Sequence, residues 1–400
     1  MRVVLCLTLC VGLSGVCESQ RYAKKIHMTV SQLITSAGYP TEKHRAVTED
    51  GYILQLHRIP AGRRSGRKTD QYSKKGKNAI LLVHGMLGGS GDFIIMGPKR
   101  SLGYLLADAG YDVWLGNLRG TIYSSHKKYT KDDPRFWNYG FHEHGKYDAP
   151  AMIDTVLNVT GLSKIMYLGY SMGTTTFFIM MSERPEYNDK LLNFVGLAPA
   201  VYLDNLKRFA TTLLKDLRLS ETIRATGMPA LNIERGVLDM LVSSMCNLRE
   251  PTQDMCMRYI YSLVGEDYEQ YDVDMVPIII RRVQPLSWRQ LEHYGKIAMT
   301  GVFTTWDGGL WHNVRPYNLS NVRIPVTLLY GENDQLTEKS SIMRLARQLD
   351  RTGVLESVNA GCSWPKFNHL DFAFARDVGT LFSAPLVNRI KTLFNKYAPN

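Results

Sequence analysis

Five short apolar runs, separated by stretches of helical length, constrain the fold of this chain more than any other feature of its sequence. They occupy residues 80–83, 112–115, 165–168, 194–197 and 326–330, and the first four end in Gly, His or Ala-Pro. Runs of this length are typical of buried parallel strands that are covered on both faces. Their alternation with helices predicts an α/β chain, a mostly parallel, doubly wound sheet.

The alternation of apolar runs with helical stretches is interrupted between residues 201 and 316. Helical patterns dominate there, for example over residues 203–219 and 233–244, and methionines and aromatic residues are frequent. We therefore expect a helical cap inserted into the sheet domain. The expected division is a core of residues 20–200, a cap of residues 201–316 and a second part of the core from 317 to 400.

The N-terminal residues have the pattern of a secretory signal peptide. Arg2 supplies a positive charge, residues 3–16 are apolar, and small residues around Cys17 offer cleavage sites. Fourteen apolar residues are too few to span a bilayer comfortably. We expect residues 1–19 to be removed and the protein to be secreted or to reach the lysosomal lumen.

In the secretory pathway, cysteines can form disulfides and asparagines can be glycosylated. Three of the six cysteines lie in the signal peptide, which leaves Cys246, Cys256 and Cys362. The close pair Cys246 and Cys256 is the natural disulfide of an oxidising compartment, and Cys362 is left as a free thiol. Asn158 and Asn318 each begin an N-glycosylation pattern.

The positive charge is concentrated in one loop. The formal net charge is +11, but residues 63–77 contain seven Lys or Arg and one Asp, so this loop alone carries +6. Such a run is typical of a solvated surface loop, and no groove-reading element accompanies it. We expect no nucleic-acid partner.

Ser171 is the predicted nucleophile. It lies in Gly169-Tyr170-Ser171-Met172-Gly173, after the apolar run 165–168 and before a helical stretch at 174–182. A strand, a turn and a helix are the context that a nucleophile elbow requires, with glycines where side chains would clash. The alternative is a serine that merely caps the helix.

A catalytic serine needs a base and an orienting acid, which follow it in the order Asp or Glu, then His. His369 is the one histidine beyond residue 320. Asp334 follows the run 326–330 in a short polar turn, where the acid belongs. Glu332 and Asp371 compete for the role, but Glu332 is too close to the strand end and Asp371 too close in sequence to the histidine.

Two backbone N–H groups are expected to stabilise the oxyanion. One is that of Met172, directly after the serine, and the other is that of Met86, in the turn that follows the run 80–83. His84 has no second ligand at metal-binding spacing, so we expect a structural role for it. His142 and His144 flank an acid, but their spacing fits no standard metal site. No metal and no cofactor are expected.

The chain resembles the acid lipase family, the gastric and lysosomal acid lipases of the α/β-hydrolase fold. The likeness extends from about Met28 to the C-terminus. It rests on the segments 38–40, 48–54, 84–85, 106–117, 146–148, 197–199, 317–319 and 368–372. The resemblance implies Ser171 as nucleophile, Asp334 as acid, His369 as base, a cap with a lid, and a cap disulfide that falls on Cys246 and Cys256. The family usually has His and Gln where this chain has Tyr170 and Met172.

We therefore expect a serine hydrolase that cleaves carboxylic esters of neutral lipids, of the triacylglycerol type, at a lipid–water interface. Met-rich and aromatic cap helices suit an apolar acyl substrate. An esterase for sterol or small esters is the alternative within the enzyme class. A non-catalytic lipid-binding protein on a hydrolase scaffold is the alternative outside it. Contact with a membrane or emulsion surface fits either class, and no obligate protein partner is expected.

Overall fold

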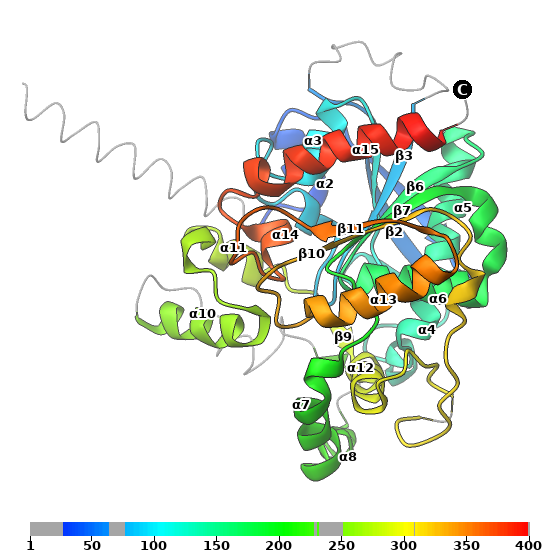
Figure 1. Cartoon of the computed structure of the whole chain (residues 1–400), viewed down its shortest axis with the longest axis vertical. Helices are drawn as coiled ribbons and strands as arrows, with labels where there is room; N and C mark the ends of the chain where they lie inside the picture. Colours follow the sequence, from blue (N-terminus) through cyan, green and yellow to red (C-terminus); the bar gives the residue numbers. More distant parts are fainter. Residues whose placement is uncertain (1–26, 64–76, 228–229, 232–250, 308, 399–400) are drawn as a thin grey trace, which may run out of the picture.

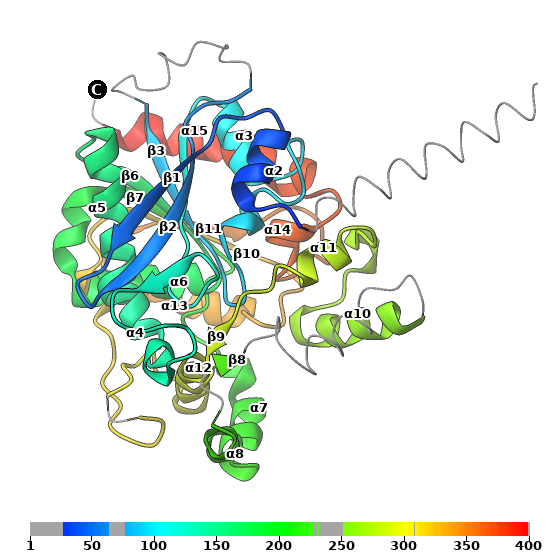
Figure 2. The same ribbon diagram turned by 180° about the vertical axis from the view of Figure 1, so that it is seen from behind.

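A twisted sheet with helices on both faces forms the centre of the molecule (Figures 1 and 2). The computed structural model describes residues 27–63, 77–227, 230–231, 251–307 and 309–398. The predicted signal peptide, most of the basic loop and Cys246 lie outside these residues. The sheet has nine strands in the order β1-β2-β4-β3-β6-β7-β10-β11, with β5 paired to β2. The strands are β1 (Glu42–Val47), β2 (Tyr52–Ile59), β3 (Ala79–Val83), β4 (Asp112–Leu115), β5 (Ser124–His126), β6 (Ile165–Tyr170), β7 (Leu191–Leu197), β10 (Val326–Tyr330) and β11 (Leu355–Ala360).

All five predicted strands are present, as β3, β4, β6, β7 and β10, and they pair in parallel. Every residue of these strands is buried. Successive side chains of a strand point to opposite faces of the sheet, so the side chains of β3 pack alternately into the hydrophobic cores on its two faces. Leu81 and Val83 pack with helices α5 (Ala149–Thr160), α6 (Met172–Glu183) and α13 (Lys339–Arg351). Ile80 and Leu82 pack with α2 (Val30–Ser36), α3 (Leu102–Asp108) and α15 (Ala384–Tyr397).

Four further strands of the sheet were not predicted. β1 and β5 each pair with β2, and β2 pairs with β4, all antiparallel. β1 buries only Ala46, and no residue of β11 is fully buried. Because such strands carry polar and charged residues on their open faces, they give no continuous apolar run.

The chain between the neighbouring strands β7 and β10 is mostly helical, and we call residues 201–316 the insertion. It contains α7 (Lys207–Thr211), α8 (Leu219–Ala225), α10 (Pro251–Val264), α11 (Val276–Ile280) and α12 (Trp288–Thr300), and a two-stranded sheet of β8 (Ala230–Leu231) and β9 (Leu286–Ser287). Figures 1 and 2 show α7, α8 and α10 projecting away from the central sheet. No helix among the described residues combines the length and apolarity that a membrane span needs.

The helix expected over residues 203–219 is interrupted. After α7 the chain widens into a π-type turn at Thr212–Asp216, and Arg218 adopts a left-handed conformation with φ of 48°. A non-glycine residue in this region ends regular helix, so α8 begins as a separate element. The predicted helix 233–244 lies outside the described residues.

A buried ion pair ties the segment after β4 to the start of α5. Arg119, whose side chain is 1% exposed, donates from Nε and Nη2 to Asp148 Oδ1 at 2.8 and 2.6 Å. Asp50 accepts from the same guanidinium at 2.6 Å. Burial raises the pKa of Asp148 to about 6 although Arg119 opposes the shift. Removing one member of such a pair leaves a charge buried without its partner.

We expect Asp148→Ala to lower the free energy of unfolding by about 3 kcal/mol, the lower end for a broken buried pair because Asp50 remains on Arg119. Denaturant titration at pH 7 measures the loss. Glu186→Ala is the matched control, since Glu186 pairs with Arg184 at 2.7 Å but is 54% exposed. The Glu186→Ala change should lower the free energy of unfolding by less than about 1 kcal/mol. Equal losses in the two variants would show that the buried pair contributes no more to stability than an exposed one.

Candidate functional site

Ser171 stands at a strained turn between β6 and α6. Its backbone has φ of 52° and ψ of −114°, a conformation rare for residues with a side chain. The Ser171 amide donates to the Leu197 carbonyl at 2.9 Å, and Thr174 N–H donates to the Ser171 carbonyl at the same distance. Strain that the surrounding structure holds in this way clusters at active sites.

The two flanking glycines make this turn possible. A Cβ on Gly169 would lie 2.6 Å from the backbone of Gly173, and one on Gly173 would lie 2.2 Å from the Val83 carbonyl oxygen. Any side chain would therefore push the helix off the strands. The spacing of the motif follows from this close approach.

Three side chains from distant parts of the chain form one hydrogen-bonded line. His369 Nε2 lies 2.8 Å from Ser171 Oγ, and His369 Nδ1 lies 2.8 Å from Asp334 Oδ2. Asp334 follows β10, and His369 lies in the loop before α14 (Asp371–Phe374). All three residues are at most 7% exposed. The serine hydroxyl can thus donate to an imidazole whose other nitrogen is held by a carboxylate.

The competing acids have other partners. Glu332 forms an exposed ion pair with Lys339 at 3.0 Å. Asp371 accepts the Asn368 backbone N–H at 2.7 Å. Of the three acids, Asp334 is the one placed on the imidazole.

Asp334 is also held by groups that sequence reasoning missed. Thr337 Oγ1 donates to Asp334 Oδ2 at 2.7 Å, and the backbone N–H groups of Leu336 and Thr337 donate to Oδ1 at 2.9 and 2.8 Å. These bonds stabilise the ionised carboxylate and fix its orientation. The polar turn after β10 is the only sequence signal for them.

Tyr170, noted above only as a departure from the family pattern, links the elbow to the base. Its hydroxyl donates to the His369 backbone carbonyl at 2.7 Å. Burial raises the pKa of Tyr170 well above its usual value, so the phenol remains a donor. Nothing in the sequence identifies this contact, since the two residues are 199 positions apart.

The turn after β3 lies directly beside the nucleophile. A Cβ on Gly85 would be 3.2 Å from Ser171 Cβ. Leu87 has φ of 62°, and its carbonyl accepts the Gln284 N–H at 2.8 Å. This places the Met86 segment next to Ser171, while Met172 is the first residue of α6, where N–H groups lack helical partners.

His84 supports this turn. Its Nε2 accepts the Leu118 N–H at 3.1 Å, so Nδ1 carries the proton and donates to the Gly85 carbonyl at 2.8 Å. Burial lowers the pKa of His84 to about 4, which keeps the ring neutral. Within the described residues, no three His, Cys, Asp or Glu side chains form a group suited to a metal ion.

A second Ser–His contact lies nearby but lacks an orienting carboxylate. His57 Nδ1 lies 2.9 Å from Ser90 Oγ, and the Gln55 amide occupies the other ring nitrogen at 2.8 Å. Asn117 accepts the Ser90 N–H and also contacts His57. Both His57 and Ser90 are fully buried. This network ties β2 to the segment after β3.

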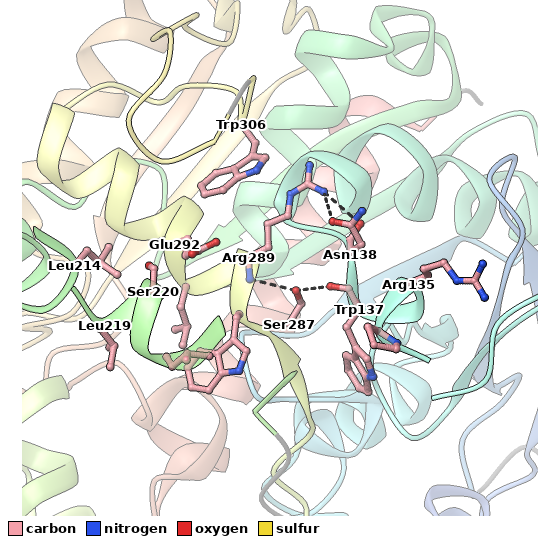
Figure 3. A pocket seen from close by; sticks show the side chains of 14 residues that line it. Arg135, Trp137, Asn138, Leu214, Leu219, Ser220, Ser287, Arg289, Glu292 and Trp306 are labelled. Carbon is pink, nitrogen blue, oxygen red and sulfur yellow. Dashed lines mark hydrogen bonds between the residues drawn. The ribbon is translucent and has the colours of Figure 1, made fainter. Parts of the chain in front are cut away.

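A cavity of about 530 Å³ lies between the insertion and the segment before α4 (Phe141–Glu143). Figure 3 shows Arg289 pointing to Asn138, and Ser287 bonded to the Trp137 carbonyl. The remaining lining residues are mainly apolar: Leu214, Leu219, Ile223, Trp288, Leu291 and Trp306, with Pro134, Arg135, Ser220 and Glu292. The cavity has the size of a small-molecule site.

The cavity wall adjoins the elbow. Gln290 lies between the lining residues Ser287 and Leu291, and its amide contacts Met172 Sδ at 3.4 Å. None of the three triad residues lines the cavity itself.

The cysteines and asparagines are placed as follows. Cys362 is a free thiol, while Cys256, on α10, belongs to a disulfide. Cys246 lies outside the described residues, so its pairing with Cys256 stays a prediction. Asn158 on α5 and Asn318 are both exposed.

Comparisons with known proteins agree with this geometry. Residues 30–97 match the model of a partial α/β-hydrolase lipase region, and residues 78–222 match the model of the α/β-hydrolase fold. Lipase 1 of Drosophila melanogaster is 35% identical over 361 residues, which cover 88% of this chain and 77% of that protein. Gastric triacylglycerol lipase of Bos taurus is 33% identical, over 93% of this chain and 95% of that protein.

A crystal structure of a protein from Sulfolobus solfataricus superposes with a TM-score of 0.55 at 12% identity, over 88% of this chain and 99% of that chain. Likeness at this identity concerns the fold alone. The two lipase relatives are about one-third identical to this chain over most of their length, and this similarity establishes the family. The chain belongs to the acid lipase family of the α/β-hydrolase fold.

Proposed function

We propose that this protein is a lipase that hydrolyses carboxylic esters of neutral lipids, of the triacylglycerol type, through an acyl-enzyme. The observation that carries the proposal is the buried line from Ser171 Oγ through His369 to Asp334, with 2.8 Å at each step. A strained serine with a base and an orienting acid has the parts that nucleophilic ester cleavage requires. The family relationship supports the same reaction.

In the proposed reaction, His369 Nε2 accepts the Ser171 proton as Oγ attacks the ester carbonyl. The N–H groups of Met86 and Met172 stabilise the oxyanion, each worth roughly 3 kcal/mol. Asp334 stabilises the imidazolium, which then passes its proton to the leaving alcohol. Water, deprotonated by His369, releases the fatty acid from Ser171. The scheme needs no cofactor and no metal.

We propose that the insertion is the cap through which lipid is approached. Many of its large apolar side chains are exposed: Phe209, Leu217, Met255, Tyr259, Leu263, Tyr268, Val273, Trp311 and Val314. Exposed apolar groups gathered on one segment favour contact with a lipid surface. The 530 Å³ cavity, which residues of the insertion also line and which is rich in Trp and Leu, suits an alkyl chain.

The setting that we propose is the secretory pathway, with export or delivery to the lysosomal lumen. There a Cys246–Cys256 disulfide would brace the cap, and Asn158 and Asn318 would accept glycans. The exposure of both asparagines and the disulfide-bonded state of Cys256 support these assignments.

A fluorophosphonate probe and a substrate panel test the proposal. Ser171 should be labelled, and triolein should be hydrolysed between pH 4 and 8. A preference for tributyrin or a cholesteryl ester would favour the esterase alternative. Absence of labelling in folded protein would favour a lipid-binding protein instead.

The triad variants give the first prediction. Ser171→Ala and His369→Ala should each lower kcat by a factor on the order of 10⁶, and Asp334→Ala by somewhat less, because the three groups act as one unit. Steady-state hydrolysis of a soluble ester measures this, with circular dichroism to verify folding. The control is Glu332→Ala, whose kcat should stay near that of the wild type. If Glu332→Ala lost activity and Asp334→Ala kept it, the assignment of Asp334 as the acid would be wrong.

The second prediction concerns Thr337. Thr337→Val keeps the shape but removes the hydroxyl that donates to Asp334 Oδ2, a bond to a charged group worth about 1.5–3 kcal/mol. We expect kcat to fall by about tenfold or more, with little change in KM. Thr337→Ser retains the donor and should recover most of the activity. If both variants lost activity equally, packing rather than the hydrogen bond would be responsible.

The third prediction concerns the cavity. Trp288→Ala removes an apolar wall, so KM for a monomeric long-chain ester should rise about tenfold, equivalent to about 1.4 kcal/mol. KM for an acetyl ester should not change. Trp311→Ala is the control, because Trp311 is exposed and does not line the cavity. If KM rose equally for the long-chain and the acetyl ester, the cavity would not be the site that binds the acyl chain.

A further inference from the structure

A chain of backbone hydrogen bonds leads from the insertion to the Met86 N–H. A trans peptide is planar, with its N–H and its C=O pointing in opposite directions, so the Gly85 carbonyl determines where the Met86 N–H points. That carbonyl accepts the Gly88 N–H at 3.2 Å. At the other end of the Gly88 peptide, the Leu87 carbonyl accepts the Gln284 N–H at 2.8 Å. One peptide plane of the turn is therefore held at both of its ends.

The turn is strained and depends on such contacts. Leu87 has φ of 62°, and at the third position of a β-turn a positive φ is usually adopted by glycine. Strain of this kind persists only where the surrounding structure enforces it. His84 Nδ1 holds the Gly85 carbonyl from the core at 2.8 Å. The Gln284 N–H holds the Leu87 carbonyl from the insertion.

The side chain of Gln284 fixes the backbone that makes this contact. The residue lies between α11 and β9 (Figure 2) and is 5% exposed. Its Oε1 accepts the Ile122 N–H at 2.9 Å, and its Nε2 donates to the Arg282 carbonyl at 2.7 Å. Its Cγ lies 3.4 Å from the place that a Cβ on Gly89 would occupy. Both polar atoms of the amide are used, and together they hold this part of the insertion against the core.

Ile122 belongs to a segment that is anchored in the core. Leu118 N–H donates to His84 Nε2 at 3.1 Å. Arg119, in the same segment, forms the buried ion pair described above. Gln284 therefore ties the insertion to a fixed part of the core, beside the histidine that also supports the turn.

We propose that Gln284 is a positioning residue of the oxyanion hole, which keeps the Met86 N–H aimed at the developing oxyanion through the peptide that joins Leu87 and Gly88. The inference deepens the proposed function and rests on it, in particular on Met86 as a donor. Hydrogen-bonded groups linked in a chain also polarise one another, so the same contact makes the Met86 N–H a stronger donor. The insertion then contributes to stabilisation of the transition state.

Gln284→Met tests the proposal, because methionine keeps the length of the side chain but has no amide to bond to Ile122 and Arg282. We expect kcat for a soluble ester to fall about tenfold or more with little change in KM, since the oxyanion forms only in the transition state. The fall should stay below the roughly 10²–10³-fold loss that follows outright removal of a donor. Circular dichroism verifies folding.

A soluble trifluoromethyl ketone separates a defect of the oxyanion hole from general structural damage. The ketone forms a tetrahedral adduct with Ser171 whose oxyanion occupies the hole, so its inhibition constant should rise by about the factor by which kcat falls. The matching alcohol carries no oxyanion and should bind unchanged. Gln253→Met is the matched control, because Gln253 is also a buried residue of the insertion, and its Nε2 donates to the Val273 carbonyl at 3.3 Å. It should leave kcat and both inhibition constants unchanged.

Leu87→Gly gives an independent test of the route through the turn. Glycine adopts a positive φ without strain, so the turn should depend less on Gln284. The loss caused by Gln284→Met should therefore be smaller in the Leu87→Gly background than in the wild type. If the two losses simply multiplied, Gln284 would not act through this turn and the proposal would be wrong.

The remaining outcomes are equally decisive. Wild-type kcat and ketone affinity in folded Gln284→Met, or an equal loss of affinity for the ketone and the alcohol, would overturn the proposal. Gln284→Asn, whose shorter amide cannot reach both partners, should show the same pattern and covers the case in which Gln284→Met does not fold. Failure of the proposed function is distinguishable, since it appears as activity retained in Ser171→Ala.

Discussion

The backbone of Ser171 is the constraint on which the site depends. A φ of 52° costs on the order of 1–3 kcal/mol for a residue with a side chain. It is maintained because β6 and α6 approach each other and β3 more closely than any Cβ at positions 169 and 173 would permit. The buried strands on either side supply the packing energy that offsets the strain. The serine hydroxyl is thereby fixed before substrate arrives.

Sequence reasoning identified the parts of the molecule whose signals are local. The five parallel strands were visible because both faces of each are covered, and the elbow was visible because its glycines follow from steric limits within five residues. Asp334 and His369 could be placed because the order of the triad along the chain left few candidates. In the structure Asp334 is hydrogen-bonded to His369, whereas Glu332 and Asp371 have other partners.

The rest depends on contacts between residues far apart in sequence. β1 and β11 are edge strands with polar open faces, so no apolar run marks them. Thr337 looks like an ordinary turn residue until the turn places it on Asp334. Sequence patterns describe burial and local geometry, whereas these contacts are set by how loops close on one another.

The hydrogen bond from Tyr170 to the His369 carbonyl has a mechanical consequence. Tyr170 is covalently bonded to Ser171, so the phenol couples the backbone that carries the nucleophile to the backbone that carries the base. The two segments are therefore tethered to each other by a buried hydrogen bond that lies outside the triad. This tether restrains the two backbones that set the 2.8 Å distance between Ser171 Oγ and His369 Nε2. The distance over which the proton is transferred is thus set by a contact outside the triad as well as by the triad itself.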